Sequence, residues 1–130
     1  MIPFHRKYRF VFILFLFYLP SCTETKTMEV TATAYNSVES QTKKGDPTTT
    51  AFGDKLKPGM KAIAVSRDLL AVEGIEHGAE VEIKGLPGKY KVLDKMNRRW
   101  TKKIDIYMGE NVAQAREWGM KQVEISWIVD

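Results

Sequence analysis

Residues 80–108, EVEIKGLPGKYKVLDKMNRRWTKKIDIYM, decide the fold of this chain. Polar and apolar residues alternate from Glu80 to Lys84, and a Gly-Leu-Pro-Gly turn leads into a second run, Lys89 to Leu93. A third alternating run, Ile104 to Met108, follows a basic connection. Alternation with a period of two is typical of strands that bury one face. The segment therefore predicts a hairpin followed by a further strand.

The same pattern continues on both sides of this segment. We expect further strands at Met28 to Tyr35, Lys61 to Ser66 and Lys121 to Val129. Glu110 to Trp118 contains good helix formers, and Gly119 follows it as a C-cap. Short strands separated by closely spaced turns predict a mainly β fold, a small six-stranded β-barrel with one or two short helices.

Two connections carry their own signals. Asn36 to Thr49 is polar and contains Gly45 and Pro47, which predicts a long surface loop. A short helical turn is expected to open near Leu69, with Ser66 or Asp68 as its cap. Trp118 and Trp127 are expected to belong to the core.

The chain begins with a basic cluster followed by a short apolar run. Arg6, Lys7 and Arg9 precede Phe10 to Leu19, which carries no charge. This order is typical of a secretory signal. A membrane-spanning helix needs about 20 apolar residues, so the run is too short to cross a bilayer. We therefore expect the chain to be exported.

Leu19-Pro20-Ser21-Cys22 follows the apolar run and resembles a lipobox, in which the cysteine is acylated and becomes the N-terminus. Cys22 is the only cysteine, so no intramolecular disulfide can form. We predict a lipoprotein signal peptide at residues 1–21, a lipidated tether at residues 22–27 and a barrel domain at residues 28–130. The expected location is the bacterial outer membrane, facing the periplasm. The alternative is an ordinary cleaved signal with an incidental cysteine.

Removal of the signal changes the charge of the chain. The full sequence has a net charge of +4 and a pI of about 9.2. Without residues 1–21, seventeen Lys and Arg face sixteen Asp and Glu, so the net charge falls to +1. A net charge this small does not indicate a nucleic-acid-binding protein. A chain of this length suits a single domain, and we expect a monomer.

Seven short motifs run in order between Val30 and Trp127. They are Thr33-Ala34-Tyr35, Thr50-Ala51-Phe52-Gly53, Ile63-Ala64-Val65, Gly78 to Gly85, Val92-Leu93-Asp94, Lys103 to Tyr107 and Ala115 to Gly119. Together they resemble the 3D domain, a family named for three aspartates. The resemblance implies a double-psi β-barrel, as in membrane-bound lytic transglycosylase A and the small stationary-phase cell-wall lytic proteins. It also implies cleavage of peptidoglycan glycan strands during cell-wall turnover.

Two positions depart from the pattern of that family. Ser66 follows the Ile-Ala-Val strand where the family usually has its first aspartate, and Asp68 comes two residues later. The family's Asp-Thr-Gly-Gly turn is replaced by Asp94-Lys95-Met96-Asn97. These changes favour a divergent site, and they leave open whether the site cleaves glycan or only binds it.

The chemistry that the resemblance implies needs one protonated carboxyl group. A lytic transglycosylase protonates the glycosidic oxygen, and the sugar's own 6-hydroxyl then attacks to give a 1,6-anhydro product. By resemblance, Asp105 matches the acid/base and Asp94 the middle aspartate that assists it. From the residues alone, the favoured interpretation of Asp105 is a solvent-facing residue on a half-buried strand. Asp94 could equally be a turn-initiating aspartate.

Further candidates would bind the substrate. Tyr35 and Thr50 match groove positions of the family. Asp68, two residues after the position of the family's first aspartate, is a further candidate. Arg98 and Trp100 lie in a basic loop between the two aspartates, where Arg can pair with carboxylates of the peptide stem and Trp can stack on a sugar.

No cofactor or metal is expected, because only His77 and Cys22 would supply typical zinc ligands after the signal is removed. We expect peptidoglycan glycan strands and, through lipid at Cys22, a membrane as partners. The alternative functions are a non-catalytic lipoprotein that binds peptidoglycan or a wall enzyme, and a purely structural envelope lipoprotein.

Overall fold

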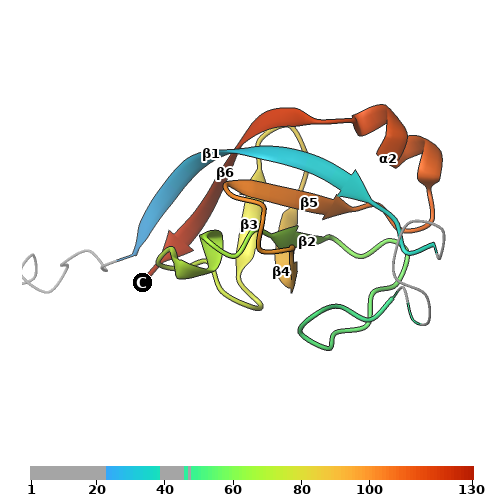
Figure 1. The fold of residues 1–130 in the computed structure, drawn as a ribbon. Coiled ribbons are helices and arrows are strands. Elements are labelled where there is room, and N and C mark those ends of the chain that lie inside the picture. Colours follow the sequence, from blue (N-terminus) through green and yellow to red (C-terminus); the bar gives the residue numbers. More distant parts are fainter. Residues whose placement is uncertain (1–22, 39–45, 47) are drawn as a thin grey trace, which may run out of the picture.

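A computed structural model describes residues 23–38, 46 and 48–130. The predicted signal peptide and lipidated Cys22 lie outside these residues. The described part forms one barrel with one α-helix and one 3₁₀ helix (Figure 1). Its elements are β1 (Glu24–Tyr35), β2 (Ala62–Val65), η3 (Leu69–Ala71), β3 (Glu80–Ile83), β4 (Lys89–Lys95), β5 (Lys103–Tyr107), α2 (Val112–Trp118) and β6 (Lys121–Val129).

The six strands close into a barrel in the order β1-β5-β2-β4-β3-β6. Two neighbouring pairs, β1 with β5 and β2 with β4, are parallel, and the other four are antiparallel. The strand directions are therefore related by an approximate two-fold axis that exchanges β1 with β4, β5 with β2 and β6 with β3. This confirms the prediction of a small, mainly β, six-stranded barrel.

The barrel interior is filled by the apolar side chains of the alternating strands. Successive inward residues such as Ile104 and Ile106 of β5 are at most 1% exposed. Full burial of one such side chain contributes about 1.5–3 kcal/mol to stability. The core comprises Val30, Ala32, Ile63, Val65, Leu69, Ile75, Val81, Ile83, Tyr90, Val92, Ile104, Ile106, Ile125, Trp127 and Val129.

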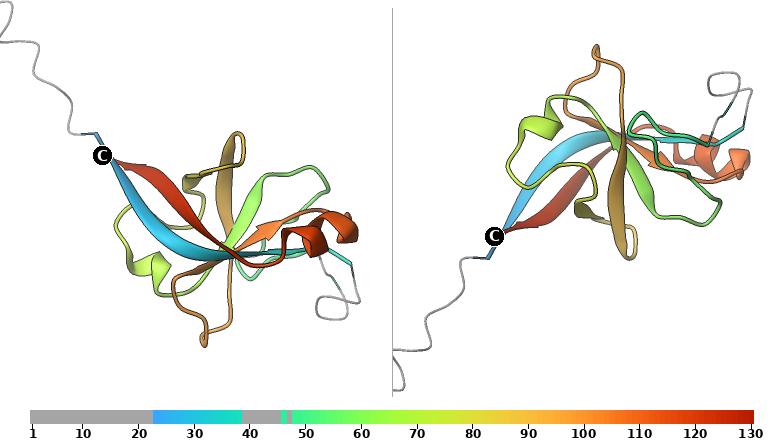
Figure 2. Two further views of the ribbon diagram at one scale, coloured as in Figure 1. Left: turned by 90° about the horizontal axis from the view of Figure 1, so that it is seen from above. Right: turned by 90° about the horizontal axis from the view of Figure 1, so that it is seen from below.

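The longest pairing joins β1 to β6. β1 begins at Glu24, four residues before the expected start at Met28, because residues 24–27 pair with the end of β6. This part of the expected tether therefore lies in the barrel. Figure 2 shows the two strands as a long twisted pair, and the chain terminates at the end of the pair where β1 begins. Among the described residues, no helix has the length and apolar character needed to span a membrane.

Three local predictions differ from the structure. The helix begins at Val112 rather than Glu110, because Asn111 caps it by accepting a hydrogen bond from the Gln114 backbone N–H at 3.0 Å. Asp68 precedes η3 but makes no side-chain cap bond. The expected surface loop after β1 starts with a residue that is fully buried, since the amide nitrogen of Asn36 donates to two backbone carbonyls beyond β5.

Candidate functional site

The two aspartates of the sequence prediction lie in one row across the barrel wall. Ala64 of β2 is paired with Asp94 of β4 on one side and with Asp105 of β5 on the other. Paired residues of neighbouring strands point to the same face, so both carboxyl groups extend on the face of Ala64. Two strand spacings separate their Cα atoms, which is roughly 10 Å. The single methyl group of Ala64 leaves the space between them open.

A bulge brings Asp94 into this row. The register of β2 and β4 shifts between Ile63, which pairs with Val92, and Ala64, which pairs with Asp94, so Leu93 is skipped. Without the shift, Leu93 would face Ala64, since a change of one residue moves every following side chain to the opposite face. Leu93 instead packs into a small second cluster with Leu56, Ala62 and Tyr107.

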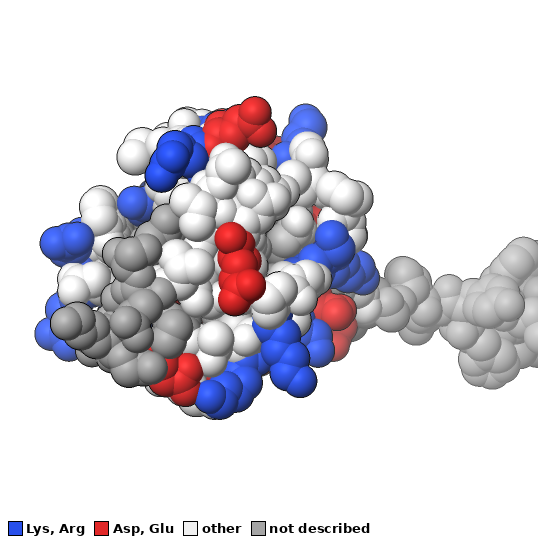
Figure 3. All heavy atoms as spheres, turned by 90° about the vertical axis from the view of Figure 1, so that its right-hand side faces the viewer, with Lys and Arg blue, Asp and Glu red and all other residues white. Residues whose placement is uncertain are grey.

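The row opens into a groove of about 530 Å³. The groove brings together five of the seven predicted catalytic and substrate-binding residues, Tyr35, Thr50, Asp94, Trp100 and Asp105. Its other lining residues are Asp46, Thr49, Ala51, Leu56, Ala64, Lys95, Met96 and Asn97. One face of the molecule shows acidic side chains near its centre, and both basic and acidic side chains toward its edge (Figure 3).

Asp105 is half-buried in the groove and carries one hydrogen bond. The Thr33 hydroxyl, from the adjacent β1, donates to its Oδ1 at 3.0 Å. Burial raises the pKa of Asp105, and the charge of Asp94 adds to this, whereas the Thr33 bond and the charge of Lys103 oppose it. The net direction is upward, so Asp105 holds a proton at a higher pH than a free aspartate does.

Asp94 is held by the backbone. Its Oδ1 accepts hydrogen bonds from the N–H groups of Ala51 and Lys95, both at 2.8 Å. Burial raises the pKa of Asp94, these two bonds lower it, and the charge of Asp54 raises it again. Both predicted carboxyl groups thus have raised pKa values, a feature typical of sites that handle protons.

Tyr35 closes the groove with a hydroxyl group that has no partner. Its ring packs on Tyr107 with 5.5 Å between the ring centroids, and its oxygen is buried without a hydrogen bond to any described residue. Burial first, and then the charges of Asp94 and Asp105, raise the pKa of Tyr35 well above its usual value. The hydroxyl group therefore stays protonated, and it is an unsatisfied donor buried in the groove wall.

Thr50 lies in the loop that forms one wall of the groove. Its hydroxyl accepts from the Asp54 backbone N–H at 3.0 Å and is thus engaged within the loop. His77, on the other side, hydrogen-bonds to Asp54 and stacks on Phe52 with 4.6 Å between the ring centroids. His77 therefore fixes the wall from which the Ala51 N–H reaches Asp94.

Asp68 and Arg98 lie outside the groove lining. Asp68 is exposed, and its carboxylate accepts from the Lys102 backbone N–H at 2.9 Å. Burial alone would raise the pKa of Asp68, but hydrogen bonds from Ser66 and Lys102 outweigh it and lower that pKa. Arg98 is exposed at the tip of the connection between β4 and β5.

Trp100 lines the groove, but cations already lie against its ring. The Lys103 ammonium is 3.6 Å from the ring centroid and the Arg99 guanidinium 4.8 Å. A sugar stacked on the ring would have to compete with these contacts. The ring is therefore better suited to positioning the two cations than to serving as a sugar platform.

Sequence reasoning missed Thr33, Ala64 and Lys95 as parts of the site. Thr33 stands in the Thr33-Ala34-Tyr35 motif, which was the available signal for it. Ala64 stands in the Ile63-Ala64-Val65 motif, but its place between the two aspartates comes only from the pairing register. Among the described residues, no group of three His, Cys, Asp or Glu side chains is arranged to hold a metal ion.

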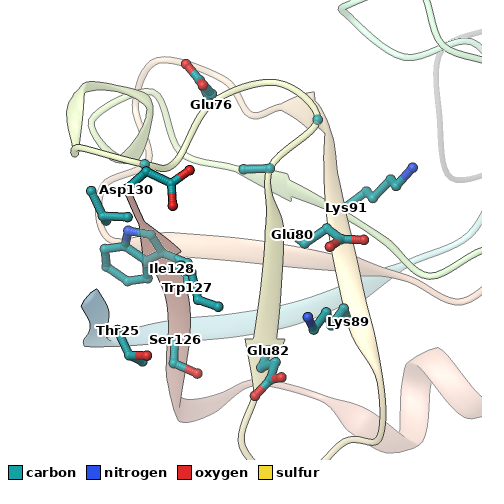
Figure 4. A pocket seen from close by; sticks show the side chains of 14 residues that line it. Thr25, Glu76, Glu80, Glu82, Lys89, Lys91, Ser126, Trp127, Ile128 and Asp130 are labelled. Carbon is teal, nitrogen blue, oxygen red and sulfur yellow. The ribbon is translucent and has the colours of Figure 1, made fainter. Parts of the chain in front are cut away.

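A larger hollow of about 740 Å³ lies elsewhere, between the end of β6 and the β3–β4 hairpin (Figure 4). Its charged side chains, Glu76, Glu80, Glu82, Lys89, Lys91 and Asp130, are spread along these segments. It contains none of the predicted site residues. We therefore place the candidate site in the smaller groove with the two aspartates.

Comparison with known proteins supports the fold but assigns no family. The sequence matches no protein-family model and no curated protein sequence. A solved structure, the Streptomyces papain inhibitor, is similar with a TM-score of 0.52 and 17% sequence identity. The similarity covers 81% of this chain and 96% of the inhibitor. At this identity the likeness concerns the barrel alone.

Proposed function

We propose that this chain is a 3D-type double-psi barrel that cleaves peptidoglycan glycan strands in the manner of a lytic transglycosylase. The observation that carries the proposal is the row Asp94–Ala64–Asp105, which opens into one groove with Tyr35. The two parallel strand pairs, related by an approximate two-fold axis, support the double-psi assignment.

Asp105 is the acid/base of the proposed reaction. Burial and the charge of Asp94 raise its pKa, so the carboxyl group keeps its proton to a higher pH than a free aspartate does. The Thr33 hydroxyl donates a hydrogen bond to Oδ1 of Asp105, and Oδ2 of Asp105 has no hydrogen-bond partner among the described residues. The proton passes from Oδ2 to the glycosidic oxygen as the bond to the anomeric carbon breaks. The sugar's 6-hydroxyl then bonds to that carbon, and its proton returns to Asp105.

Asp94 supplies negative charge beside this reaction. Two backbone N–H groups bind its Oδ1, and such bonds favour the ionised form. Asp105 has only the Thr33 hydroxyl, so Asp105 rather than Asp94 is the group that holds the proton. An ionised Asp94 also stabilises the positive charge that develops on the sugar.

The proposed location is the periplasmic face of the outer membrane, with lipid on Cys22. β1 begins at Glu24, directly after the proposed anchor, and extends over 12 residues, which is roughly 35–40 Å. Figure 1 shows the start of β1 at one end of the molecule and its end, which carries Tyr35, at the other. An anchored barrel would therefore present this end of the groove away from the membrane surface.

A second candidate function is binding of glycan without cleavage. It is favoured by the engagement of Asp94, whose Oδ1 already serves two backbone N–H groups, and by Ser66 at the position of the family's first aspartate. In that case Asp105 would accept a hydrogen bond from a sugar hydroxyl and transfer no proton.

The test is incubation of the full chain, kept soluble in a mild detergent, with purified peptidoglycan, followed by mass spectrometry of the released fragments. An Asp105→Asn variant is the matched control, because it keeps the side-chain shape without the acid. We expect 1,6-anhydro products that disappear in the variant. Products with free reducing ends would indicate hydrolysis, and retention on the wall without any product would favour the binding function.

A further inference from the structure

The connection between β4 and β5 is strongly basic. Residues 95–103, the basic loop, contain five Lys and Arg side chains and no acidic one. None of these cations forms an ion pair with the described residues, whose ion pairs are Lys26 with Glu73, Lys55 with Asp46 and His77 with Asp54. The loop projects from the side of the barrel (Figure 2).

The basic loop is held at both ends by three consecutive residues that follow β2. Arg67 donates from Nε to the Met96 carbonyl at 3.0 Å. Ser66 accepts from the Lys103 N–H at 3.0 Å, and Asp68 accepts from the Lys102 N–H at 2.9 Å. A loop fixed in this way loses little conformational entropy when it binds a ligand.

The tip of the basic loop is ordered in the same way. The Asn97 side chain accepts from the Arg99 N–H at 3.0 Å, and its carbonyl accepts from the Trp100 N–H at 3.1 Å. Asn97 and Trp100 line the groove, so Arg98 and Arg99, between them, stand at its rim. Both arginines are exposed, and Arg99 lies against the Trp100 ring.

We propose that the basic loop binds carboxylate groups on peptide branches of the glycan in the groove, with Arg98 and Arg99 as its principal contacts. This deepens the proposed function and rests on glycan occupying that groove. The charge distribution selects the ligand class. A chain lying over Asp94 and Asp105 must be uncharged there, while negative groups at the rim beside Asn97 and Trp100 would meet the arginines. A sugar backbone with carboxylate-bearing branches fits both conditions.

A polymer with phosphodiesters in its backbone fits less well, because its negative charges would lie over the two aspartates. Arginine suits carboxylates in particular, since its planar guanidinium can donate two parallel hydrogen bonds to one carboxylate. Trp100 acts as a positioning residue, whose ring holds the side chains of Arg99 and Lys103 at the rim.

The test measures binding to two matched ligands by calorimetry, with the full chain in detergent and Asp105→Asn present throughout to prevent cleavage. One ligand is a glycan oligomer with free stem-peptide carboxylates, and the other is the same oligomer after amidation of its carboxyl groups. We expect about 5- to 10-fold tighter binding of the free-carboxylate oligomer. This preference should diminish between low and high salt.

The Arg98→Gln/Arg99→Gln variant should bind both oligomers equally, at the level of the amidated one. The matched control is Lys84→Gln/Arg116→Gln, which removes the same charge from exposed positions on other elements and should keep the preference. Arg98→Lys/Arg99→Lys should give an intermediate result, because lysine keeps the charge without the paired donors. Unchanged melting temperatures would verify folding.

The proposal is overturned if the starting protein shows no preference, if the arginine variant retains it, or if the control loses it equally. Tighter binding of poly(glycerol phosphate) than of the peptide-bearing oligomer would also overturn it, in favour of a phosphodiester ligand. Cleavage is scored separately with Asp105 restored. Absence of cleavage with the carboxylate preference intact would refute the proposed reaction alone, and absence of binding to either oligomer would refute both.

Discussion

The close contact of Gly74 with Trp127 and Val129 of β6 gives a sharp test of the fold. Gly74 has a φ of +89°, and a Cβ atom added there would lie 2.8 Å from Trp127 Cδ1 and 2.9 Å from Val129 Cγ2. Both neighbours belong to β6 and are buried in the core, so neither can move freely. Gly74→Ala should therefore destabilise the protein for two independent reasons, overpacking and backbone strain.

The expected magnitude follows from these two contributions. Overpacking of a tight core costs about 1–3 kcal/mol, and a non-glycine residue at positive φ about 1–2 kcal/mol. Together they amount to about 2–5 kcal/mol, out of a total stability of about 5–15 kcal/mol. For a domain of this size, the melting temperature should fall by about 10 °C or more.

Gly53→Ala is the matched control. Gly53 has a φ of +96°, but no atom lies within 4 Å of the added Cβ, so only the backbone strain applies. Thermal unfolding followed by circular dichroism should show a fall of about 4–8 °C for this variant. Equal losses in the two variants would refute the packing of Gly74 against β6, and with it the way in which the barrel closes.

Three further predictions concern the groove. Because the pKa of Asp105 is raised in the folded state, folding stability falls as pH rises from the ordinary aspartate pKa to the folded-state value. Asp105→Asn should therefore unfold at a higher urea concentration than the wild type at pH 7, but not at pH 3. Thr33→Val removes a hydrogen bond that favours the ionised form of Asp105, so the alkaline limb of the cleavage pH profile should move to higher pH. A shift to lower pH would contradict the assignment of Asp105 as the acid. Tyr35→Phe removes a buried hydroxyl without a partner, so the free energy of unfolding should stay the same or rise by about 1 kcal/mol, while glycan affinity falls by about 5-fold.

The strands could be predicted from sequence because their signal is local. The Glu80 to Lys84 run and the Ile104 to Met108 run each alternate cleanly, and both lie in strands of the barrel. Their order around the barrel could not be predicted, because it depends on pairings between segments far apart in the chain. The extra length of β1 has the same origin, since the polar residues 24–27 are strand only because β6 lies beside them.

The candidate site was predictable only in part for a similar reason. Asp94 and Asp105 were found through the motif resemblance, but their shared face depends on the bulge at Leu93. The sequence carries a trace of this bulge, since Val92 and Leu93 are two successive apolar residues in an otherwise alternating strand, and both are buried. Thr33 belongs to a recognised motif, but its contact with Asp105 could not be predicted, because the two residues are 72 positions apart in the chain.

The two departures from the 3D pattern, Ser66 and the turn after Asp94, lie on segments that are hydrogen-bonded to each other. Ser66, at the family's first aspartate position, accepts a hydrogen bond from Lys103 at the end of the basic loop, and Asp68 accepts one from Lys102. An aspartate at position 66 would place a second carboxylate in a position that is 0% exposed and already used to fix the loop. Ser66 therefore fits the basic loop that follows Asp94 better than an aspartate would. In the proposed function, the arginine variants test how the basic loop selects its ligand, and Asp105→Asn tests the acid separately.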